Sequence, residues 1–432
     1  HSKYSATEKP IVIADENLTA DTEMKEQISE IDAVVISAGS IEASDRKRAT
    51  AALTPMDIYT TAGSQGQTTT GYKFLPGVQN AGESEGLFVR GGTGSETKFF
   101  IDGNLVNNYF SNSVPGLAGR ERFNTSIFKG SVFSSGGYSA LYGQALSSVL
   151  LLESIDMPEQ SSYSFSVFPF ALGGDYQHLN KNKNASYGLA ASISDLSLVT
   201  KVLNFETDFI KAPRSISANG NFRIKTKAGG FLKYYGSFDT NTLTVSQPSL
   251  EKNYDEQQPS VNGNNTFHSL TYKQKLGRYL MNLGSSFSIN KNDFEIGILN
   301  GGSQFGTVKM HNEGIYWNSK AVFERKIATV SNIKAGFELL SENDKTESSI
   351  FNATSQNNSI QNFTTALFAE NNLAISRDFS TSLGVRAENS SFLNQWNIAP
   401  RFSAAYRLSE KWVSSLAYGI FYQTPESKFL ST

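Results

Sequence analysis

The 432-residue chain contains no cysteine and only four histidines, and its formal net charge is −2. Without cysteine there can be no disulfide, thiolate metal ligand or cysteine nucleophile. The near balance of acidic and basic residues argues against a nucleic-acid partner. No HxxxH, GxSxG or Walker pattern occurs, so we expect no catalytic site, metal site or cofactor, and no enzyme.

Long apolar runs are also missing. The longest, such as VLLLESI at 149–155, have the length of a strand and fall short of the roughly 18–20 apolar residues of a membrane helix. What the chain has instead is 30 Phe, 18 Tyr and 35 Gly, a composition that favours β structure. A membrane β-barrel remains compatible with this sequence, because alternating strands keep the average hydropathy low.

From about residue 161 onward, apolar and polar residues alternate. The clearest stretch puts an apolar set on one strand face (Phe379, Thr381, Leu383, Val385 and Ala387) and a polar set on the other (Ser380, Ser382, Gly384, Arg386 and Glu388). In a soluble β protein, such as an adhesin, the apolar face would form the core. In an outer-membrane barrel the apolar face meets lipid and the polar face lines the lumen.

The lengths of the links between strands favour the barrel. Short links at 228–230, 276–278 and 408–411 alternate with long polar links such as 241–266 and 290–314. Short turns at one end and long loops at the other are typical of transmembrane barrels. We count about 13 strands, whereas a barrel that encloses a globular domain needs about 22. We therefore expect the sequence to be a piece of a longer protein.

Residues 46–156 read as a mixed α/β unit instead. LTPMDIYTTAG predicts a short helix with Thr54 as its N-cap and Pro55 at its first position. KFFIDG predicts a strand that ends in a turn centred on Asp102 and Gly103. The small residues of SSGGYSALYGQALSSVLLLE would let backbones approach closely, as in a unit enclosed by a barrel.

Three blocks in this order, IDAVVISAG, LFVRGG with FIDG, and GGYSALYGQALSSVL, precede the alternating strands. Together they resemble the plug and barrel of TonB-dependent outer-membrane transporters, from about Ile31 to the C-terminus. The resemblance implies a mixed α/β plug (46–156), then an antiparallel transmembrane β-barrel (157–432), in the bacterial outer membrane. Residues 1–30 are similar to the end of a regulatory-like β module found in Bacteroidetes-type transporters, or form a flexible leader.

Such transporters import a scarce nutrient when TonB, energised by the inner-membrane proton gradient, pulls on an extended segment. Residues 31–45 resemble this TonB box and its linker, although an ordinary first strand of the plug would read similarly. Strand addition to a sheet edge would provide the grip. The candidate residues are Asp32, Ala33, Val34, Val35, Ile36, Ser37 and Ala38.

In this family, plug arginines often meet carboxylates of the barrel wall, and the resemblance implies such a latch here. The plug-motif residues are Arg90, Gly91, Gly92, Asp102, Gly103, Arg120 and Arg122. The candidate wall partners are Glu338, Glu370 and Glu388. The alternative is that these arginines only hydrogen-bond plug carbonyls.

Ligand contacts are expected from plug loops at 82–85, 93–96 and 107–119, each of which could also be an ordinary solvated turn. The candidates are Glu83, Glu85, Glu96, Tyr109 and Phe110. A ferric siderophore or similar chelate is the favoured ligand. A SusC-like glycan or peptide importer with a surface lipoprotein, and a surface receptor that does not transport, remain alternatives.

Overall fold

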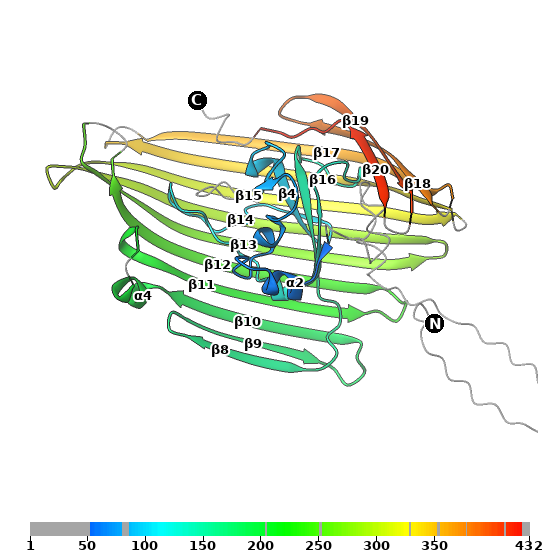
Figure 1. Ribbon diagram of the computed structural model, residues 1–432, viewed down its shortest axis with the longest axis horizontal. Helices are drawn as coiled ribbons and strands as arrows, with labels where there is room; N and C mark the ends of the chain where they lie inside the picture. The colour runs from blue at the N-terminus through cyan, green and yellow to red at the C-terminus, as the bar shows by residue number, and fades with distance from the viewer. Residues whose placement is uncertain are drawn as a thin grey trace, which may run out of the picture.

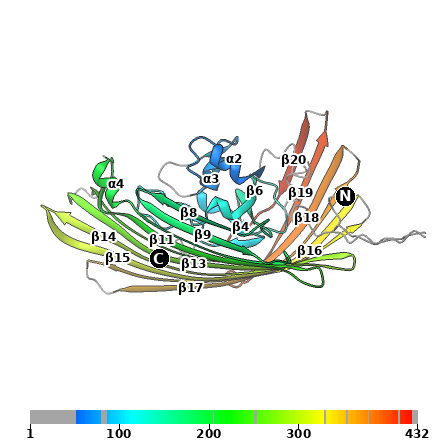
Figure 2. The same cartoon turned by 90° about the horizontal axis from the view of Figure 1, so that it is seen from below.

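The computed structural model describes residues 52–79, 86–203, 205–249, 253–327, 330–351, 355–376, 378–409 and 412–425. The predicted TonB box at 32–38 lies outside the described residues, as do Glu83 and Glu85. The described chain folds into a small globular unit that lies against the concave face of one large curved sheet (Figures 1 and 2).

The large sheet has thirteen strands, and each pairs antiparallel with the next one in sequence, from β8 at one end to β20 at the other. This confirms the expected strand number and the antiparallel barrel-type order. The strands are β8 (Ser162–Phe168), β9 (Ala171–Leu179), β10 (Ala185–Asp195), β11 (Asp208–Lys225), β12 (Phe231–Pro248), β13 (Glu256–Leu276), β14 (Tyr279–Asn300), β15 (Ser303–Ile327), β16 (Ser331–Ile350), β17 (Gln356–Ala374), β18 (Phe379–Ser390), β19 (Gln395–Arg407) and β20 (Val413–Gly419).

The prediction of long polar links between the strands is wrong. Strand β12 continues to Pro248, and β14 and β15 are joined by residues 301–302 alone. With 25 residues, β15 is far longer than the roughly 9–11 residues that a tilted strand needs to cross a bilayer. The polar sequence is therefore strand that continues past the apolar band, because backbone pairing does not depend on side-chain polarity. A helix, α4 (Ser197–Val202), links β10 to β11.

The two faces of the sheet are inverted relative to a soluble protein. On β18, Leu383 and Val385 are 52% and 44% exposed, whereas Arg386 and Glu388 are 2% and 6% exposed. The apolar residues point outward, and the charged ones lie beneath the globular unit. The soluble alternative, in which the apolar face forms the core, is wrong, since strands β8 to β20 form one sheet whose apolar side chains are exposed on the outward face.

The globular unit is a five-stranded sheet in the order β1-β6-β7-β4-β5, with a two-stranded ribbon β2-β3 beside it. Strands β4 and β7 pair in parallel and the other pairs are antiparallel. Its elements are β1 (Ala52–Leu53), α2 (Pro55–Thr60), α3 (Thr68–Tyr72), β2 (Val78–Gln79), β3 (Phe88–Val89), η2 (Gly94–Glu96), β4 (Thr97–Ile101), β5 (Asn104–Val106), η3 (Thr125–Ile127), β6 (Phe128–Ser134) and β7 (Ser148–Ser154).

The local predictions for this unit are confirmed. Thr54 caps α2 in a capping box with Asp57, and Pro55 occupies the first helical position. Asp102 and Gly103, with φ of 50° and 86°, form the tight turn between β4 and β5. No helix among the described residues is long and apolar enough to cross a membrane.

Candidate functional site

A cavity of about 1070 Å³ lies between loops of the globular unit and the concave face of the sheet. We call it the vestibule. Its floor comes from segments within 86–117, and its wall comes from inward-facing residues of β13 to β17. These wall residues lie on the half of each strand away from the short turns at 226–230 and 277–278.

Amide side chains dominate the polar surface of the vestibule. Asn112 donates to the side chain of Asn292, and Asn241 donates to the Asn112 carbonyl oxygen at 2.6 Å. The amides that line the cavity are Asn107, Asn108, Asn112, Gln144, Asn292, Asn312 and Asn362. Phe88 and Phe110 add apolar surface. A concave site with convergent hydrogen-bonding groups and aromatic patches suits a small polar ligand.

The predicted ligand residues differ in their availability. Phe110 is partly exposed and lines the vestibule. Tyr109 also lines the vestibule but is only 3% exposed, because its ring stacks on Phe99 at 4.1 Å and on Phe123 at 5.5 Å; its contact with a ligand stays a prediction. Glu96 accepts hydrogen bonds from Thr93 and closes the η2 turn.

Glu121, which the sequence did not single out, ties the loop beneath the vestibule to helix α3. Its carboxylate accepts hydrogen bonds from the backbone nitrogens of Thr68 and Thr69 at 2.9 and 2.6 Å, and from the Tyr109 hydroxyl at 3.2 Å. Burial raises the pKa of Glu121, and the Thr69 and Thr68 hydrogen bonds oppose that rise. No local sequence pattern predicts this contact, because Glu121 lies 53 residues from Thr68 in the sequence.

On the β12–β13 side, the unit meets the wall through aromatic rings. Phe123 lies 5.4 Å from Phe267 edge-on and 6.2 Å from Tyr235, between ring centroids. All three belong to one hydrophobic cluster that joins the unit to the wall. We call this contact the apolar junction. Asn104 adds a hydrogen bond to Ser269 at 2.8 Å.

On the β15–β19 side, the contact is ionic. Arg386 of β18 forms ion pairs with Glu338 at 2.7 Å and with Glu388 at 2.5 Å, all three being nearly inaccessible to solvent. Lys320 of β15 lies 3.9 Å from Glu338. These wall charges neutralise one another in place, which is what a buried charged cluster requires.

Lys320 and two further wall charges, Arg401 and Glu370, hold residues 138–144 of the globular unit by their backbone. Arg401 donates to the carbonyl oxygen of Tyr142 at 2.8 Å, and Lys320 donates to that of Leu141. Glu370 accepts from the Ala140 nitrogen at 2.9 Å. We call this contact the ionic junction.

Gly143 occupies its tightest point. A Cβ atom there would lie 2.3 Å from a Glu388 oxygen and 2.6 Å from the Arg386 guanidinium, so only glycine fits without a shift.

The predicted pairing between plug arginines and the wall carboxylates is wrong. Glu338 and Glu388 are paired with Arg386, which belongs to the wall itself. Arg90 and Arg120 are exposed. Arg122 does form an ion pair with a wall carboxylate, but that partner is Asp239 of β12. Arg386 falls on the predicted lumen face, so its alternation with Glu388 was the available signal.

The other plug-motif residues have structural positions. Asp102 accepts hydrogen bonds from the Ser154 nitrogen and hydroxyl at 2.9 and 2.6 Å and lies 3.7 Å from the Lys233 ammonium of β12. Burial raises the pKa of Asp102, but Lys233 and the Ser154 hydrogen bonds outweigh burial and leave it lowered. Gly91 has φ of 85°, and a Cβ on Gly92 would lie 2.5 Å from Glu96.

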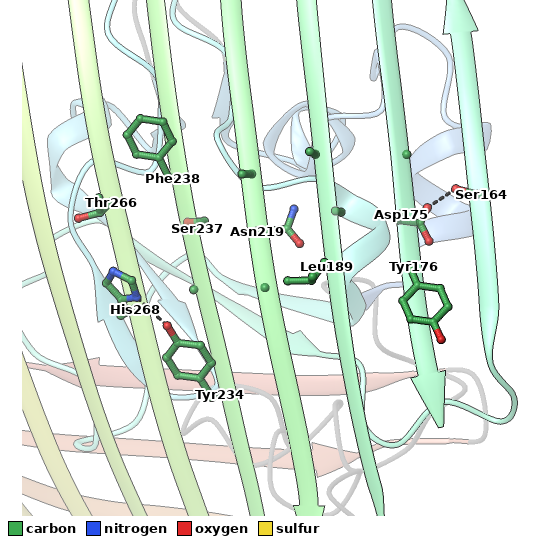
Figure 3. A pocket seen from close by; sticks show the side chains of 16 residues that line it. Ser164, Asp175, Tyr176, Leu189, Asn219, Tyr234, Ser237, Phe238, Thr266 and His268 are labelled. Atoms are coloured by element: carbon green, nitrogen blue, oxygen red, sulfur yellow. Dashed lines mark hydrogen bonds between the residues drawn. The ribbon is translucent and has the colours of Figure 1, made fainter. Parts of the chain in front are cut away.

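A second hollow, of about 720 Å³, crosses strands β8 to β13 on the outward face of the sheet (Figure 3). Gly220 and Gly236 are paired neighbours in its floor, with Leu189 beside them. The Tyr234 hydroxyl and the His268 Nδ1 atom form a 2.8 Å hydrogen bond at its rim. It lies on the face opposite the globular unit, so it takes no part in the vestibule.

Solved structures with the same fold are siderophore receptors. A mutant of the ferric enterobactin receptor from Pseudomonas aeruginosa matches with a TM-score of 0.62 and 14% identity over 88% of this chain and 63% of that one. The ferric yersiniabactin uptake receptor FyuA from Yersinia pestis matches at 0.63 and 12%, over 84% and 62%. The siderophore receptor PirA from Acinetobacter baumannii matches at 0.63 and 12%, over 90% and 63%.

The chain thus spans less than two thirds of the length of these receptors. None of the curated proteins compared with the sequence matches it. The family model described as TonB dependent receptor-like, beta-barrel matches residues 211–427, just over half of the 432 residues. That match covers most of the sheet, and the globular unit against the concave face is a plug. The chain therefore belongs to the TonB-dependent receptor β-barrel family of the bacterial outer membrane.

Proposed function

We propose that the protein imports a scarce nutrient across the outer membrane, driven by TonB and gated by the plug. The observation that carries the proposal is the pairing of an amide-lined vestibule of about 1070 Å³ with a plug held in the lumen directly below it. A ligand collected in the vestibule can proceed only if the plug moves. The sheet end with the turns at 226–230 and 277–278 would face the periplasm, and the end where the strands continue past the apolar band would face outward, as in other outer-membrane barrels.

The favoured ligand is a ferric siderophore or similar chelate. Support comes from the matched structures, which are described as receptors for ferric enterobactin, ferric yersiniabactin and a siderophore. In this proposal, residues 46–156 form the plug and 157–432 the barrel portion. Residues 1–30 and the TonB box at 31–45 precede them, in the Bacteroidetes-type arrangement. Outer-membrane lipid contacts the outward apolar face.

The experiment is uptake by a deletion strain complemented with the full-length gene. Growth is compared on single sources of ferric chelate, cobalamin, glycan or peptide, with and without a protonophore. We expect restored growth on ferric chelates that the protonophore abolishes. Growth restored only on a glycan or peptide would favour the SusC-like alternative, in which a surface lipoprotein takes part.

The TonB box is tested separately with Val35→Pro. Proline removes a backbone donor and would prevent strand addition to TonB. We expect loss of uptake with ligand binding at the cell surface unchanged, and Thr19→Pro in the preceding segment serves as the control. Equal uptake by the Val35→Pro variant and the wild type would contradict the assignment of residues 32–38. Surface binding without energy-dependent uptake by the wild type would support a receptor that does not transport.

A further inference from the structure

Three cavities follow one another along the ionic junction. The vestibule shares Leu105 and Gln144 with a narrow cavity of about 10 Å³, which we call the neck. A third cavity, of about 100 Å³, lies beyond Leu141 and Tyr142 of the plug and shares no lining residue with the neck. Its wall comes from β13 to β16 and reaches Lys334, near the start of β16. Movement of the plug segment that contains Leu141, Tyr142 and Gly143 would join the three spaces into one track from the vestibule toward the periplasmic side.

The neck closes the track with few atoms. On the plug side it is lined by Gly143 and Gln144, and on the wall side by Glu338, Thr364 and Arg386 among others. The plug segment that would have to move here, residues 138–144, is held by backbone hydrogen bonds to wall charges and by packing of Ala140 and Leu141 against the wall. Lys320 and Arg386 keep Glu338 and Glu388 as partners within the wall when the segment leaves. Arg401 and Glu370 form their hydrogen bonds with this segment and would exchange them for water in the opened lumen.

The β12–β13 side offers no comparable release. There, Phe123, Tyr235 and Phe267 are 2%, 7% and 0% exposed and belong to one cluster. Separating them would expose aromatic surface to a wet lumen, which is unfavourable because apolar surface would be transferred into water. The ion pair of Arg122 with Asp239 would also be broken, leaving each charge without its partner.

We propose that the transport route runs along the β15–β18 wall, and that residues 138–144 are the part of the plug that moves to open it. The apolar junction is the hinge that keeps the rest of the plug in place. This inference rests on the proposed function, because it names the path that the imported ligand takes.

The test uses single thiols, since the chain contains no cysteine. Thr364→Cys places a thiol in the neck, and Ser269→Cys places one beside the apolar junction; both wild-type side chains belong to residues that are 3% exposed. Intact cells that express the full-length protein, supplied with mixed ferric catecholate and hydroxamate chelates, are treated with sulfonatoethyl methanethiosulfonate. We expect labelling at Thr364→Cys to be several-fold faster in energised cells than with a protonophore, and labelling at Ser269→Cys to be unchanged.

A disulfide lock provides a second measurement that does not depend on labelling. The Cβ atom of Ala140 lies 3.0 Å from the position of a Cβ on Gly384. This pair is close enough to be bridged after small adjustments. The Ala140→Cys/Gly384→Cys lock should stop uptake of the ferric chelates until a reductant is added. The single variant Ala140→Cys, treated with the same oxidant, is the control and should leave uptake intact.

Failures of the route and of the function are distinguishable. If the wild type takes up chelate with energy dependence but Ser269→Cys is labelled as fast as Thr364→Cys, the route is wrong and the function stands. Uptake that continues through the oxidised Ala140→Cys/Gly384→Cys lock would overturn the route in the same way. If the wild type shows no uptake and neither the Thr364→Cys nor the Ser269→Cys variant shows energy-dependent labelling, the proposed function fails and the route with it.

Discussion

Two of the contacts between the plug and the described wall differ in their main interaction, although Ala140 and Leu141 of the ionic junction also pack against Val322 and Phe368. The apolar junction joins Phe123 to Tyr235 and Phe267 by ring contacts. The ionic junction joins the backbone of 138–144 to charged side chains of β15 to β19, centred on Arg386. Both are almost fully buried, so they differ in the kind of interaction and not in its exposure.

The difference shows how one domain can be both anchored and releasable. Apolar contacts lose free energy steadily as surface is exposed to water. Charged contacts in a wet lumen can be exchanged for water at little net cost, provided that no charge is left buried alone. The centre of the ionic junction meets this condition because Arg386 keeps Glu338 and Glu388 as partners, whereas Arg401 and Glu370 depend on water to replace their bonds to the plug.

The largest effect is expected from Arg386→Ala, which would leave Glu338 and Glu388 buried without a cation between them. Removing one partner of a buried pair costs about 3–5 kcal/mol. The plug of the full-length protein in detergent should therefore unfold at lower urea concentration, and cells should become sensitive to a large antibiotic such as vancomycin. Arg90→Ala, at an exposed plug arginine, is the control and should do neither. Equal sensitivity of both variants would show that the ionic junction does not hold the plug closed.

Phe267→Ala tests the other junction. Truncating a fully buried ring leaves a cavity and costs about 3 kcal/mol. Because no charge is involved, the loss measured by urea unfolding should be the same at low and high salt. Phe267→Leu retains most of the apolar volume and should recover much of the loss. A strong salt dependence in Phe267→Ala would show that the two junctions are not energetically separate.

Acid should act on the Asp102 contact with Lys233, below the apolar junction. The pKa of Asp102 is lowered in the fold, so its contribution is present above the ordinary value of 3.8 and is lost as pH falls through the lowered one. Asp102→Asn should cost about 2 kcal/mol at neutral pH, the value of hydrogen bonds to a charged group. Urea unfolding at several pH values should show this difference fading below pH 3.8. A constant difference down to lower pH would contradict the charged role of Asp102.

The smallest effect is expected from Thr54→Ala, which removes the N-cap of α2 away from both junctions. Loss of a cap costs about 1 kcal/mol. The plug should be slightly less stable in urea, with antibiotic sensitivity and uptake unchanged. Thr54→Asp retains a capping side chain and should restore stability. A leak in Thr54→Ala would show that any loss of plug stability opens the pore, and the two junctions would then need no separate roles.

Local features of both domains were predictable because they depend on neighbouring residues. Thr54 and Pro55 mark the start of a helix by themselves, and Asp102 with Gly103 can adopt the positive φ angles of a tight turn. The alternation around Arg386 fixed which side chains share a strand face. The polarity of stretches such as 241–266 predicts loops, but most of this stretch is strand, because backbone pairing does not depend on side-chain polarity.

Partners across long separations were not predictable. Glu121 reaches Thr69 over 52 residues, and Arg401 reaches Tyr142 over 259. The sequence marked Glu338 and Glu388 as inward-facing, but it could not show that Arg386 would neutralise them from the same wall.

The sequence by itself determined the plug-then-barrel order, the antiparallel strands and the apolar face of each strand, which points outward, since period and turn residues are local properties. Only the tertiary structure decided that Tyr109 is covered, that Arg122 pairs with Asp239, and that the wall grips 138–144 by backbone atoms. Carbonyl oxygens are the same at every position of the chain. Hydrogen bonds to them therefore produce no pattern in the sequence and depend on which segments the fold brings together.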